Sequence, residues 1–542
     1  MKKIIKKHAL LNAVEYKGRA QVQAVLGKIL AEKPELKKDI KKLKKEVEKI
    51  VKEVNKLSLE KQKEELKKFG KIKKKKPKER VGLPELPNAK KGKVITRFAP
   101  EPNGYLHFGH LKAAFLSYLY AKKYKGKCYL RFEDTNPQKE KKEYYKAIRE
   151  DLKAFGIKFD KEFLESDYME TFYKYAEKLI KKGYFYVCNC PQEKIKKMRA
   201  EGKACSCRER SIKENLELWK KMLKNAKEGS MIVRFKTDPS HENPALRDPS
   251  MFRIIEAPHP LKGKKYRVYP LYNFACVVMD HILKITHVLR DKGFENDAKI
   301  QEMLYKALGW KIPVIIQFGR IKTVAGIPMK KRKIKKLIEE GKLKSFEDIR
   351  IPTPRNLLKR GFKPEAIKRL IEEIGPSKAD INISFETLAS YNRQIIDPIA
   401  NRYFFISEPF QIELDKLVAK IIKAPLHPNK KVYRRIPATK KIFIEKLDFV
   451  QYKNKEVRLM HFCNILLGKK SKVTGKKLKN IPKIHWVSTK NFKVKLIMPD
   501  GREVNGLAEP EVKKVKKDDI VQLERVGFAR CEKKGLFYFA HK

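Results

Sequence analysis

Two histidines flank a glycine in the run His-Phe-Gly-His at 107–110, directly after the turn-forming run Pro-Glu-Pro-Asn-Gly at 100–104. A helix that begins here would present unpaired backbone N–H groups and the positive end of its dipole, an arrangement that binds phosphate. His107 and His110 are three residues apart and can both reach one anion, while Gly109 leaves room for a flat base against the backbone. The alternative is that the histidines only fill a helix start. The whole pattern favours a phosphate-binding turn.

The elements on either side are those of a nucleotide-binding sheet. The apolar run from Val94 to Phe98 predicts a buried strand, and residues 111–119 carry apolar side chains at the three- and four-residue spacings of a helix. A second predicted strand, 128–132, ends in the acidic pair Glu133-Asp134. Because ligands of such sheets bind at the carboxyl ends of the strands, we expect the turn and the acidic pair at one site.

Four cysteines form a second candidate site. Cys188 and Cys190 are separated by fourteen residues from Cys205 and Cys207. Four thiolates in two close pairs can hold zinc tetrahedrally, in a closed structural site with no catalytic water. The alternative is four reduced cysteines that bind no metal.

The composition narrows the class of protein. The chain has 542 residues, 42% of them hydrophobic, and a formal net charge of +65. No apolar run reaches the length of a membrane span and no signal peptide is evident, so we expect a cytoplasmic protein without a membrane partner. So large a positive charge attracts polyanions and favours a nucleic-acid partner. The alternative is a lysine-rich proteome, in which lysine covers every surface regardless of function.

Two runs together resemble a known family. RFAPEPNGYLHFGH at 97–110 and RFEDTNP at 131–137 resemble the motifs of the glutamyl- and glutaminyl-tRNA synthetases, which are class I enzymes. The resemblance extends over most of the chain and fits the archaeal type of glutamyl enzyme. It implies that L-glutamate is activated with ATP and Mg²⁺ to glutamyl-adenylate and transferred to the 3′ end of tRNA-Glu. It also implies that His107 and His110 are catalytic.

The resemblance further implies an amino-acid pocket. In glutamyl enzymes a Tyr, an Asn and an Arg line the pocket at the places of Tyr269, Asn273 and Arg290. Arg97 lies beneath them, and Glu133 meets the substrate ammonium. Tyr269 and Asn273 share a face if their segment is helical; the alternative is that they are core and cap residues. A guanidinium grips a carboxylate with paired hydrogen bonds, whereas the neutral amide of glutamine would leave a buried Arg290 uncompensated. Arg290 therefore favours glutamate.

A cationic loop at 326–333, GIPMKKRK, stands where the class has its second motif. Such a loop can close over a triphosphate and neutralise the charge on departing pyrophosphate; the alternative is a solvated basic face. Glutamyl enzymes of this type usually read Leu-Ser-Lys-Arg-Lys here, so Lys331 aligns with the catalytic lysine and Lys330 replaces serine. The resemblance thus implies ATP contacts for Pro100, Asn103, His107, Gly109, His110, Met329 and Lys331.

The expected fold class is a multidomain α/β plus β protein. A heptad-like apolar seam between Leu36 and Leu57 predicts a helical hairpin or small bundle, and short strands after residue 402 predict one or two β-barrels. In archaeal-type enzymes such barrels bind the anticodon. The expected parts are a helical N-terminal extension (1–88), a Rossmann-type catalytic domain in two halves (89–187 and 263–333), an inserted acceptor-end-binding domain (188–262), a helical connecting subdomain (334–401) and the β-barrel region (402–542).

Two other functions stay open. One is a glutaminyl-tRNA synthetase, which Arg290 and Asn273 oppose. The other is a tRNA-binding paralogue without activity, which the change at Lys330 suggests. The sequence also leaves open whether tRNA-Gln is charged with glutamate and whether the N-terminal helices bind a protein partner. We expect a monomer.

Overall fold

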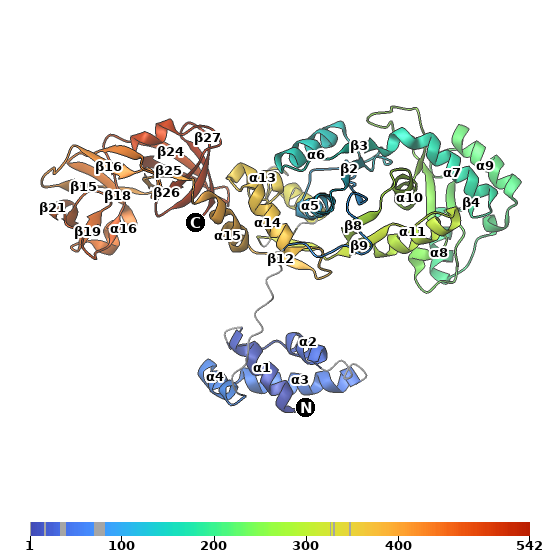
Figure 1. The fold of residues 1–542 in the computed structure, drawn as a ribbon, viewed down its shortest axis with the longest axis horizontal. Helices are drawn as coiled ribbons and strands as arrows, with labels where there is room; N and C mark the ends of the chain where they lie inside the picture. The colour runs from blue at the N-terminus through green and yellow to red at the C-terminus, as the bar shows by residue number, and fades with distance from the viewer. Residues whose placement is uncertain are drawn as a thin grey trace. The chain divides into compact units, whose positions relative to one another are not determined.

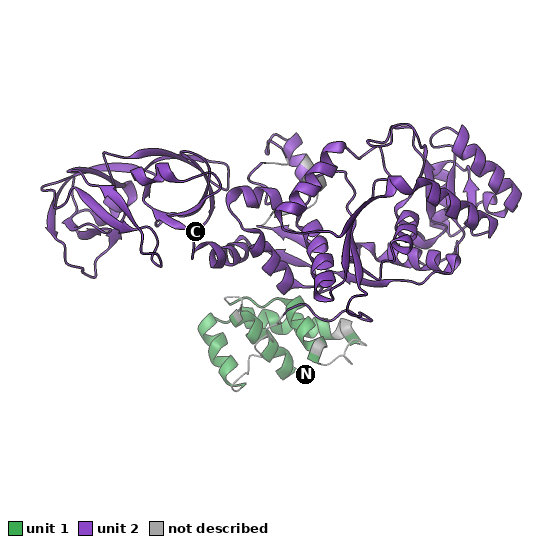
Figure 2. Ribbon diagram, turned by 45° about the horizontal axis from the view of Figure 1, so that its top comes forward, with its two compact units in different colours: residues 1–81 green, residues 82–542 purple. Residues whose placement is uncertain are grey.

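The structure is a computed structural model that describes residues 2–15, 18–32, 39–69, 82–325, 327–328, 331–345 and 348–542; the side chains of residues 15, 31, 40–42, 327–328, 331–333 and 335 are not described. The chain forms two compact units, residues 1–81 and 82–542 (Figure 2). The second unit begins earlier than the expected residue 89. Leu86 explains this, because it is buried in the core of the second unit and its backbone N–H donates to the Tyr124 hydroxyl at 2.8 Å.

The first unit is a small helical bundle. Residues from its helices, among them Ile5, Val25, Val47 and Val54, share one buried apolar cluster. Buried Gln62 donates to the carbonyl oxygens of Gly18, Val54 and Leu57, at 2.9 to 3.1 Å. The helices are α1 (Lys2–Glu15), α2 (Val22–Glu32), α3 (Ile40–Asn55) and α4 (Leu59–Lys67).

The second unit starts with the predicted parallel strands. Strands β1, β2 and β3 pair in that order, and β8 pairs in parallel with β9. The backbone N–H of Thr286, next to β8, donates to the Ile95 carbonyl at 2.9 Å and joins the two sheets. The strands are β1 (Ile95–Phe98), β2 (Lys127–Phe132), β3 (Lys161–Leu164), β8 (His287–Asp291) and β9 (Val314–Phe318); the helices around them are α5 (Phe108–Lys123), α6 (Lys142–Ala154), α10 (Tyr272–Ile282) and α11 (Glu295–Leu308) (Figure 1).

An antiparallel sheet separates the two halves of the parallel one. Its strands β4, β5, β6 and β7 pair in that order. The last strand, β7, is followed directly in the sequence by α10. Its aromatic core includes Trp219, Phe252 and Phe274, which pack at ring-centroid distances of 4.9 to 5.3 Å. The elements are α7 (Met169–Lys181), β4 (Phe185–Cys188), α8 (Gln192–Glu201), α9 (Ile212–Lys224), β5 (Ile232–Phe235), β6 (Ser250–Ile254) and β7 (Val268–Pro270).

A mixed segment leads to two seven-stranded, barrel-like sheets at the C-terminal end. One sheet has the order β13-β26-β27-β28-β24-β25-β14 and the other β22-β19-β20-β21-β15-β18-β23. Arg360 of α13 donates to the carbonyl oxygens of Phe539 and Ala540, at 3.2 and 2.7 Å, and ties the segment to β28. The segment holds β10 (Ile321–Val324), β11 (Ile327–Pro328), α12 (Lys331–Glu339), α13 (Pro354–Arg360), α14 (Pro364–Ile374), β12 (Ile381–Ile383) and α15 (Phe385–Ile396).

The strands of the barrel-like region are short and connected by turns, as predicted. Pro499-Asp500-Gly501 forms one of these turns between β24 and β25, which pair antiparallel. Among the described helices, none is long and apolar enough to cross a membrane. The remaining elements are β13 (Asn401–Tyr403), β14 (Phe405–Ile406), β15 (Pro409–Leu414), β16 (Ile421–Pro425), β17 (Tyr433–Pro437), β18 (Lys441–Glu445), α16 (Lys446–Tyr452), β19 (Glu456–Leu459), β20 (Asn464–Leu466), β21 (Lys470–Gly475), β22 (Lys483–Ile484), β23 (Val487–Ser488), β24 (Phe492–Ile497), β25 (Glu503–Ala508), β26 (Ile520–Leu523), β27 (Gly527–Lys533) and β28 (Leu536–His541).

Candidate active site

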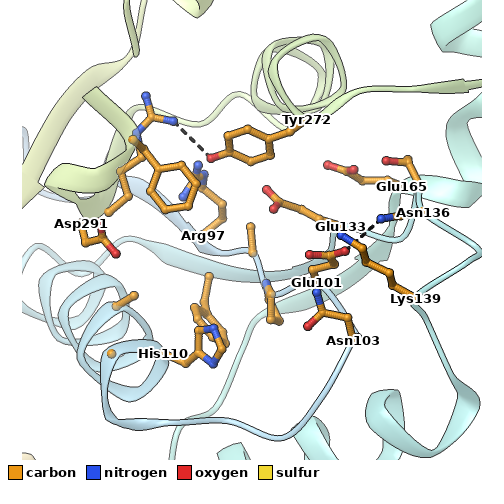
Figure 3. Close-up of a pocket in the computed structure, with 18 of the residues that line it drawn as sticks. Arg97, Glu101, Asn103, His110, Glu133, Asn136, Lys139, Glu165, Tyr272 and Asp291 are labelled. Carbon is orange, nitrogen blue, oxygen red and sulfur yellow. Dashed lines mark hydrogen bonds between the residues drawn. The ribbon is translucent and has the colours of Figure 1, made fainter. Parts of the chain in front are cut away.

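A cavity of about 580 Å³ lies at the carboxyl ends of β1, β2 and β8, where ligands of such sheets bind. Figure 3 shows Arg97, Glu133 and Tyr272 converging on it, with His110 at its helical edge. The predicted residues that line it are Arg97, Pro100, Asn103, His107, Gly109, His110, Glu133 and Arg290. The structure therefore brings residues of both predicted subsites, for phosphate and for amino acid, into one cavity.

The phosphate-binding edge is the N-terminus of α5. His107 is its N-cap: the imidazole Nδ1 accepts from the backbone N–H groups of Gly109 and His110, at 3.1 and 3.3 Å. The two imidazole rings stack at a centroid distance of 3.7 Å. A Cβ at Gly109 would lie 2.9 Å from Cε1 of His107, so the glycine makes room for the capping ring. Gly109 also lines the cavity, and its expected role of leaving space for a base stays a prediction.

Replacing the cap tests this geometry. We expect His107→Ala to lower the free energy of unfolding by about 1 kcal/mol, because two backbone donors lose their acceptor. His107→Asn supplies a capping oxygen and is expected to restore most of that loss. Hydrogen exchange of the first amides of α5 measures the effect. Equal protection of these amides in wild type and His107→Ala would contradict it.

Beneath the cavity lies a buried ionic network. Oδ1 of Asp280 pairs with Nε of Arg97 at 3.1 Å and with Nη1 of Arg131 at 2.6 Å. Arg131 also pairs with Glu133 at 2.9 Å and Glu165 at 3.2 Å. Burial alone would raise the pKa of Asp280, but the two guanidinium groups hold that pKa below its usual value. The positive charges of Arg97 and Arg131 are thus largely compensated by neighbouring carboxylates.

The guanidinium of Arg290 has different hydrogen-bond partners from those of Arg97 and Arg131. Its Nη1 donates to Oε1 of Gln301 at 2.9 Å and to the Tyr272 hydroxyl at 3.3 Å, and both acceptors are neutral. Its Nε and Nη2 are buried and have no hydrogen-bond partner among the residues that the structure describes. These two N–H groups point in parallel from one edge of the guanidinium, the edge that binds a carboxylate with two hydrogen bonds. Arg290 is a cation poised for an anionic ligand.

Two predicted pocket residues lie elsewhere. Tyr269 belongs to β7 and is buried away from the cavity, where its hydroxyl donates to the Tyr266 carbonyl at 3.2 Å. Asn273 does not line the cavity either. The pair shares no helical face, because α10 begins only at Tyr272, after Pro270. Tyr272, three residues beyond Tyr269, provides the tyrosine that lines the cavity.

The acidic pair after β2 divides into two roles. Glu133 lines the cavity, whereas Asp134 accepts from the backbone N–H and hydroxyl of Ser166, at 2.9 and 2.8 Å, and from the Tyr145 hydroxyl at 3.1 Å. Burial raises the pKa of Asp134 to about 6 and that of Glu140, four residues after Asn136, to about 8. Asp134 therefore connects the end of β2 to Ser166 and Tyr145, and it does not line the cavity.

The cationic loop at 326–333 lies partly outside the residues that the structure describes. Gly326, Met329 and Lys330 lie outside the described residues. Lys331 begins α12, and its side chain is not described. The catalytic role of Lys331 and the ATP contact of Met329 stay predictions.

The four cysteines form one cluster. Their Sγ atoms all lie within 4.8 Å of one another, with Cys188 and Cys205 at 3.8 Å and Cys190 and Cys207 at 3.7 Å. None is in a disulfide. Four sulfurs bound to one zinc ion at about 2.3 Å would be about 3.8 Å apart. The geometry fits a tetrahedral thiolate site.

Comparison with known families agrees with the fold. The chain matches the catalytic domain of tRNA synthetases class I (E and Q) over residues 93–398, and two anticodon-binding domains of the same family over residues 400–485 and 483–532. The first match alone spans more than half of the chain. The chain belongs to this family of class I aminoacyl-tRNA synthetases.

Individual relatives narrow the family to one kind of enzyme. A glutamate–tRNA ligase of Pyrococcus horikoshii is 43% identical over 100% of both chains, and one of Korarchaeum cryptofilum is 41% identical over 98% of both. A glutamate–tRNA ligase of Methanocaldococcus jannaschii is 42% identical over 97% of this chain and 96% of its own. A solved glutamate tRNA ligase of Elizabethkingia meningosepticum, in complex with its amino acid, is 22% identical with a TM-score of 0.43, covering 57% of this chain and 70% of its own, too distant to bear on the site.

Proposed function

We propose that this chain is a glutamate–tRNA ligase. It activates L-glutamate with ATP to glutamyl-adenylate and transfers the glutamyl group to the 3′ end of tRNA-Glu. The observation that carries the proposal is the unpaired edge of Arg290. This buried cation has no anionic partner among the residues that the structure describes, and it lies in a cavity that also contains a helix N-terminus. The full-length similarity to glutamate–tRNA ligases supports the same conclusion.

Arg290 selects the amino acid in this proposal. The charge of Arg97 is already compensated by Asp280, whereas Arg290 has no ion pair among the described residues, so of these two Arg290 is the guanidinium that favours a second carboxylate over an amide. We assign it the side-chain carboxylate of glutamate. Glu133, on the cavity wall, receives the substrate ammonium, and Tyr272 takes the place expected of Tyr269. Asn273 acts behind Arg290 and does not touch the substrate.

The reaction has two steps. An oxygen of the glutamate α-carboxylate attacks the α-phosphorus of ATP, and the bond to the bridging oxygen of the β-phosphate breaks, releasing pyrophosphate. A hydroxyl of the terminal tRNA ribose then attacks the acyl carbon, loses its proton and releases AMP. Such chemistry depends on positioning and on charge stabilisation. Mg²⁺ enters with ATP and offsets the triphosphate charge.

The residues proposed for ATP surround the start of α5. The positive end of the α5 dipole attracts the phosphates, and His107 and His110, whose rings lie at this helix end, contact them. Pro100, Asn103 and Gly109 form the wall beside them. Met329 and Lys331 complete the set, with Lys331 and its neighbouring cations neutralising pyrophosphate.

The C-terminal sheets are proposed to bind the tRNA anticodon, since residues 400–532 match the anticodon-binding domains of the family. The insertion, 188–262, is proposed to approach the acceptor end. ATP, tRNA and glutamate are substrates of protein synthesis, so we place the reaction in the cytoplasm. We also propose that the protein is a monomer. Charging of tRNA-Gln with glutamate is a second candidate activity, decided by the assay below.

The cysteine cluster adds a structural zinc ion to the proposal. We expect about one zinc ion per chain, and its loss in Cys188→Ser and Cys205→Ser, because each variant removes one of four thiolates. Elemental analysis of the purified protein measures it. Cys463→Ser, which alters a buried cysteine in the barrel-like region, is the control and should retain the metal. A wild-type protein without zinc would mean that the cysteines are simply reduced.

Aminoacylation tests the function. Purified protein is assayed with tRNA-Glu and tRNA-Gln, each with glutamate and with glutamine. The proposal predicts glutamate on tRNA-Glu. Glutamate on both tRNAs would add misacylation to it, and charging with glutamine would make the chain a glutaminyl enzyme. Binding of tRNA without any charging would make it a tRNA-binding paralogue.

A further inference from the structure

We propose that Gln301 is a positioning and specificity-determining residue for glutamate, because it orients Arg290 without neutralising it. The proposal rests on the proposed function. Gln301 lies on α11 and does not line the cavity, yet its side chain is almost fully buried, with 3% of the residue exposed. Its amide oxygen accepts from Nη1 of Arg290 at 2.9 Å.

Gln301 is the middle of a chain of hydrogen bonds. Its Nε2 donates to Oδ1 of Asn273 at 3.1 Å, and Nδ2 of Asn273 donates to Oδ1 of Asp297 at 2.9 Å. Arg290 can only donate and the Asp297 carboxylate can only accept, so both amides have one allowed orientation. The same orientations follow from either end of the chain. The hydrogen bonds therefore determine the orientation of the Gln301 amide, and the Gln301 amide oxygen holds Nη1 of Arg290 in place.

This series of hydrogen bonds also keeps two opposite charges apart. Two neutral amides lie between the Arg290 guanidinium and the Asp297 carboxylate. The nearby Asp291 carboxylate is occupied elsewhere, since it accepts from Nε of Arg320 at 3.2 Å and from the Gly293 backbone. Nη1 of Arg290 is therefore satisfied by neutral acceptors, and its charge stays available to a ligand.

Arg97 and Arg131 differ from Arg290, because a carboxylate and not an amide accepts their hydrogen bonds. Both are paired directly with the Asp280 carboxylate; Arg97 lines the cavity and Arg131 is fully buried beneath it. A carboxylate in the place of the Gln301 amide would treat Arg290 in the same way. The substrate carboxylate would then compete with an internal one for a single cation.

The test replaces the amide by a carboxylate of the same shape. In Gln301→Glu we expect the KM for glutamate to rise at least tenfold, with the KM for ATP within about twofold of wild type, since only the amino-acid subsite is altered. The preference for glutamate over glutamine, measured as the ratio of kcat/KM values, should fall by a similar factor. Lys299→Gln is the control, because it changes the charge of α11 by the same amount on an exposed residue.

A second variant separates orientation from charge. Gln301→Met keeps the length of the side chain but removes the acceptor, so we expect a higher KM for glutamate with no gain for glutamine. It also decides the question if Gln301→Glu does not fold. The proposal is overturned if the KM for glutamate changes less than twofold in the folded variants, or if the KM for ATP rises equally. A wild-type protein that does not charge tRNA-Glu in the same assay would instead refute the proposed function.

Discussion

In Arg290→Met, kcat/KM for glutamate is expected to fall by about 30- to 5,000-fold, the range that follows from the roughly 2–5 kcal/mol lost when one partner of a buried charge pair is removed. The side chain keeps its length and its apolar stem, but the substrate carboxylate loses both hydrogen bonds and its counter-charge. Selectivity against glutamine should fall as well, since glutamine needs no cation.

Steady-state aminoacylation of tRNA-Glu at varied glutamate and ATP concentrations measures this effect. Arg149→Met is the matched control, because Arg149 pairs with Glu162 on the exposed surface and lies outside the cavity. We expect it to leave kcat/KM within about twofold of wild type, as for most exposed ion pairs. An equal loss in both variants, or none in Arg290→Met, would contradict the role of Arg290.

Asp280→Asn should destabilise the catalytic sheet by about 3–5 kcal/mol, the usual effect of breaking a buried ion pair. Asparagine has nearly the same shape, so the loss is electrostatic: Arg97 and Arg131 would lose the carboxylate that they share. Glu133 and Glu165 can compensate Arg131 in part, which places the expected value at the lower end of the range.

Hydrogen exchange of the amides of β1 and β2 measures this loss, because it reports on the catalytic sheet separately from the C-terminal sheets. Asp167→Asn is the control: this aspartate pairs with Lys262 and is about half exposed, so its removal should change stability by less than about 1 kcal/mol. Unchanged protection of β1 and β2 in Asp280→Asn would contradict the network.

The strand–turn–helix–strand core was predictable because its signals are local. The Pro-Glu-Pro-Asn-Gly turn ends β1, and the three- and four-residue spacings mark α5. The expectation that Tyr269 and Asn273 share a helical face was wrong for a reason that is also local. A spacing of four fits a helix, but it does not say where the helix begins, and Pro270 separates a strand from the helix here. Giving that proline its usual weight as a boundary would have favoured Tyr272.

Other parts of the site have no signal in the sequence. Asp280 compensates Arg131, which is 149 residues away along the chain. Gln301 is an uncharged residue on an amphipathic helix, where a glutamine predicts only a polar surface. Its role follows from burial and from the direction of three hydrogen bonds, which only a folded structure provides.

The most direct test of the account is a crystal structure of the protein with bound L-glutamate. The account predicts a carboxylate oxygen at about 2.7–2.9 Å from Nε and another from Nη2 of Arg290, with Nη1 still donating to Gln301. That result would show the unpaired edge filled by the substrate side chain. Glutamate bound with its side chain on another cation, and the edge of Arg290 still unpaired, would contradict it.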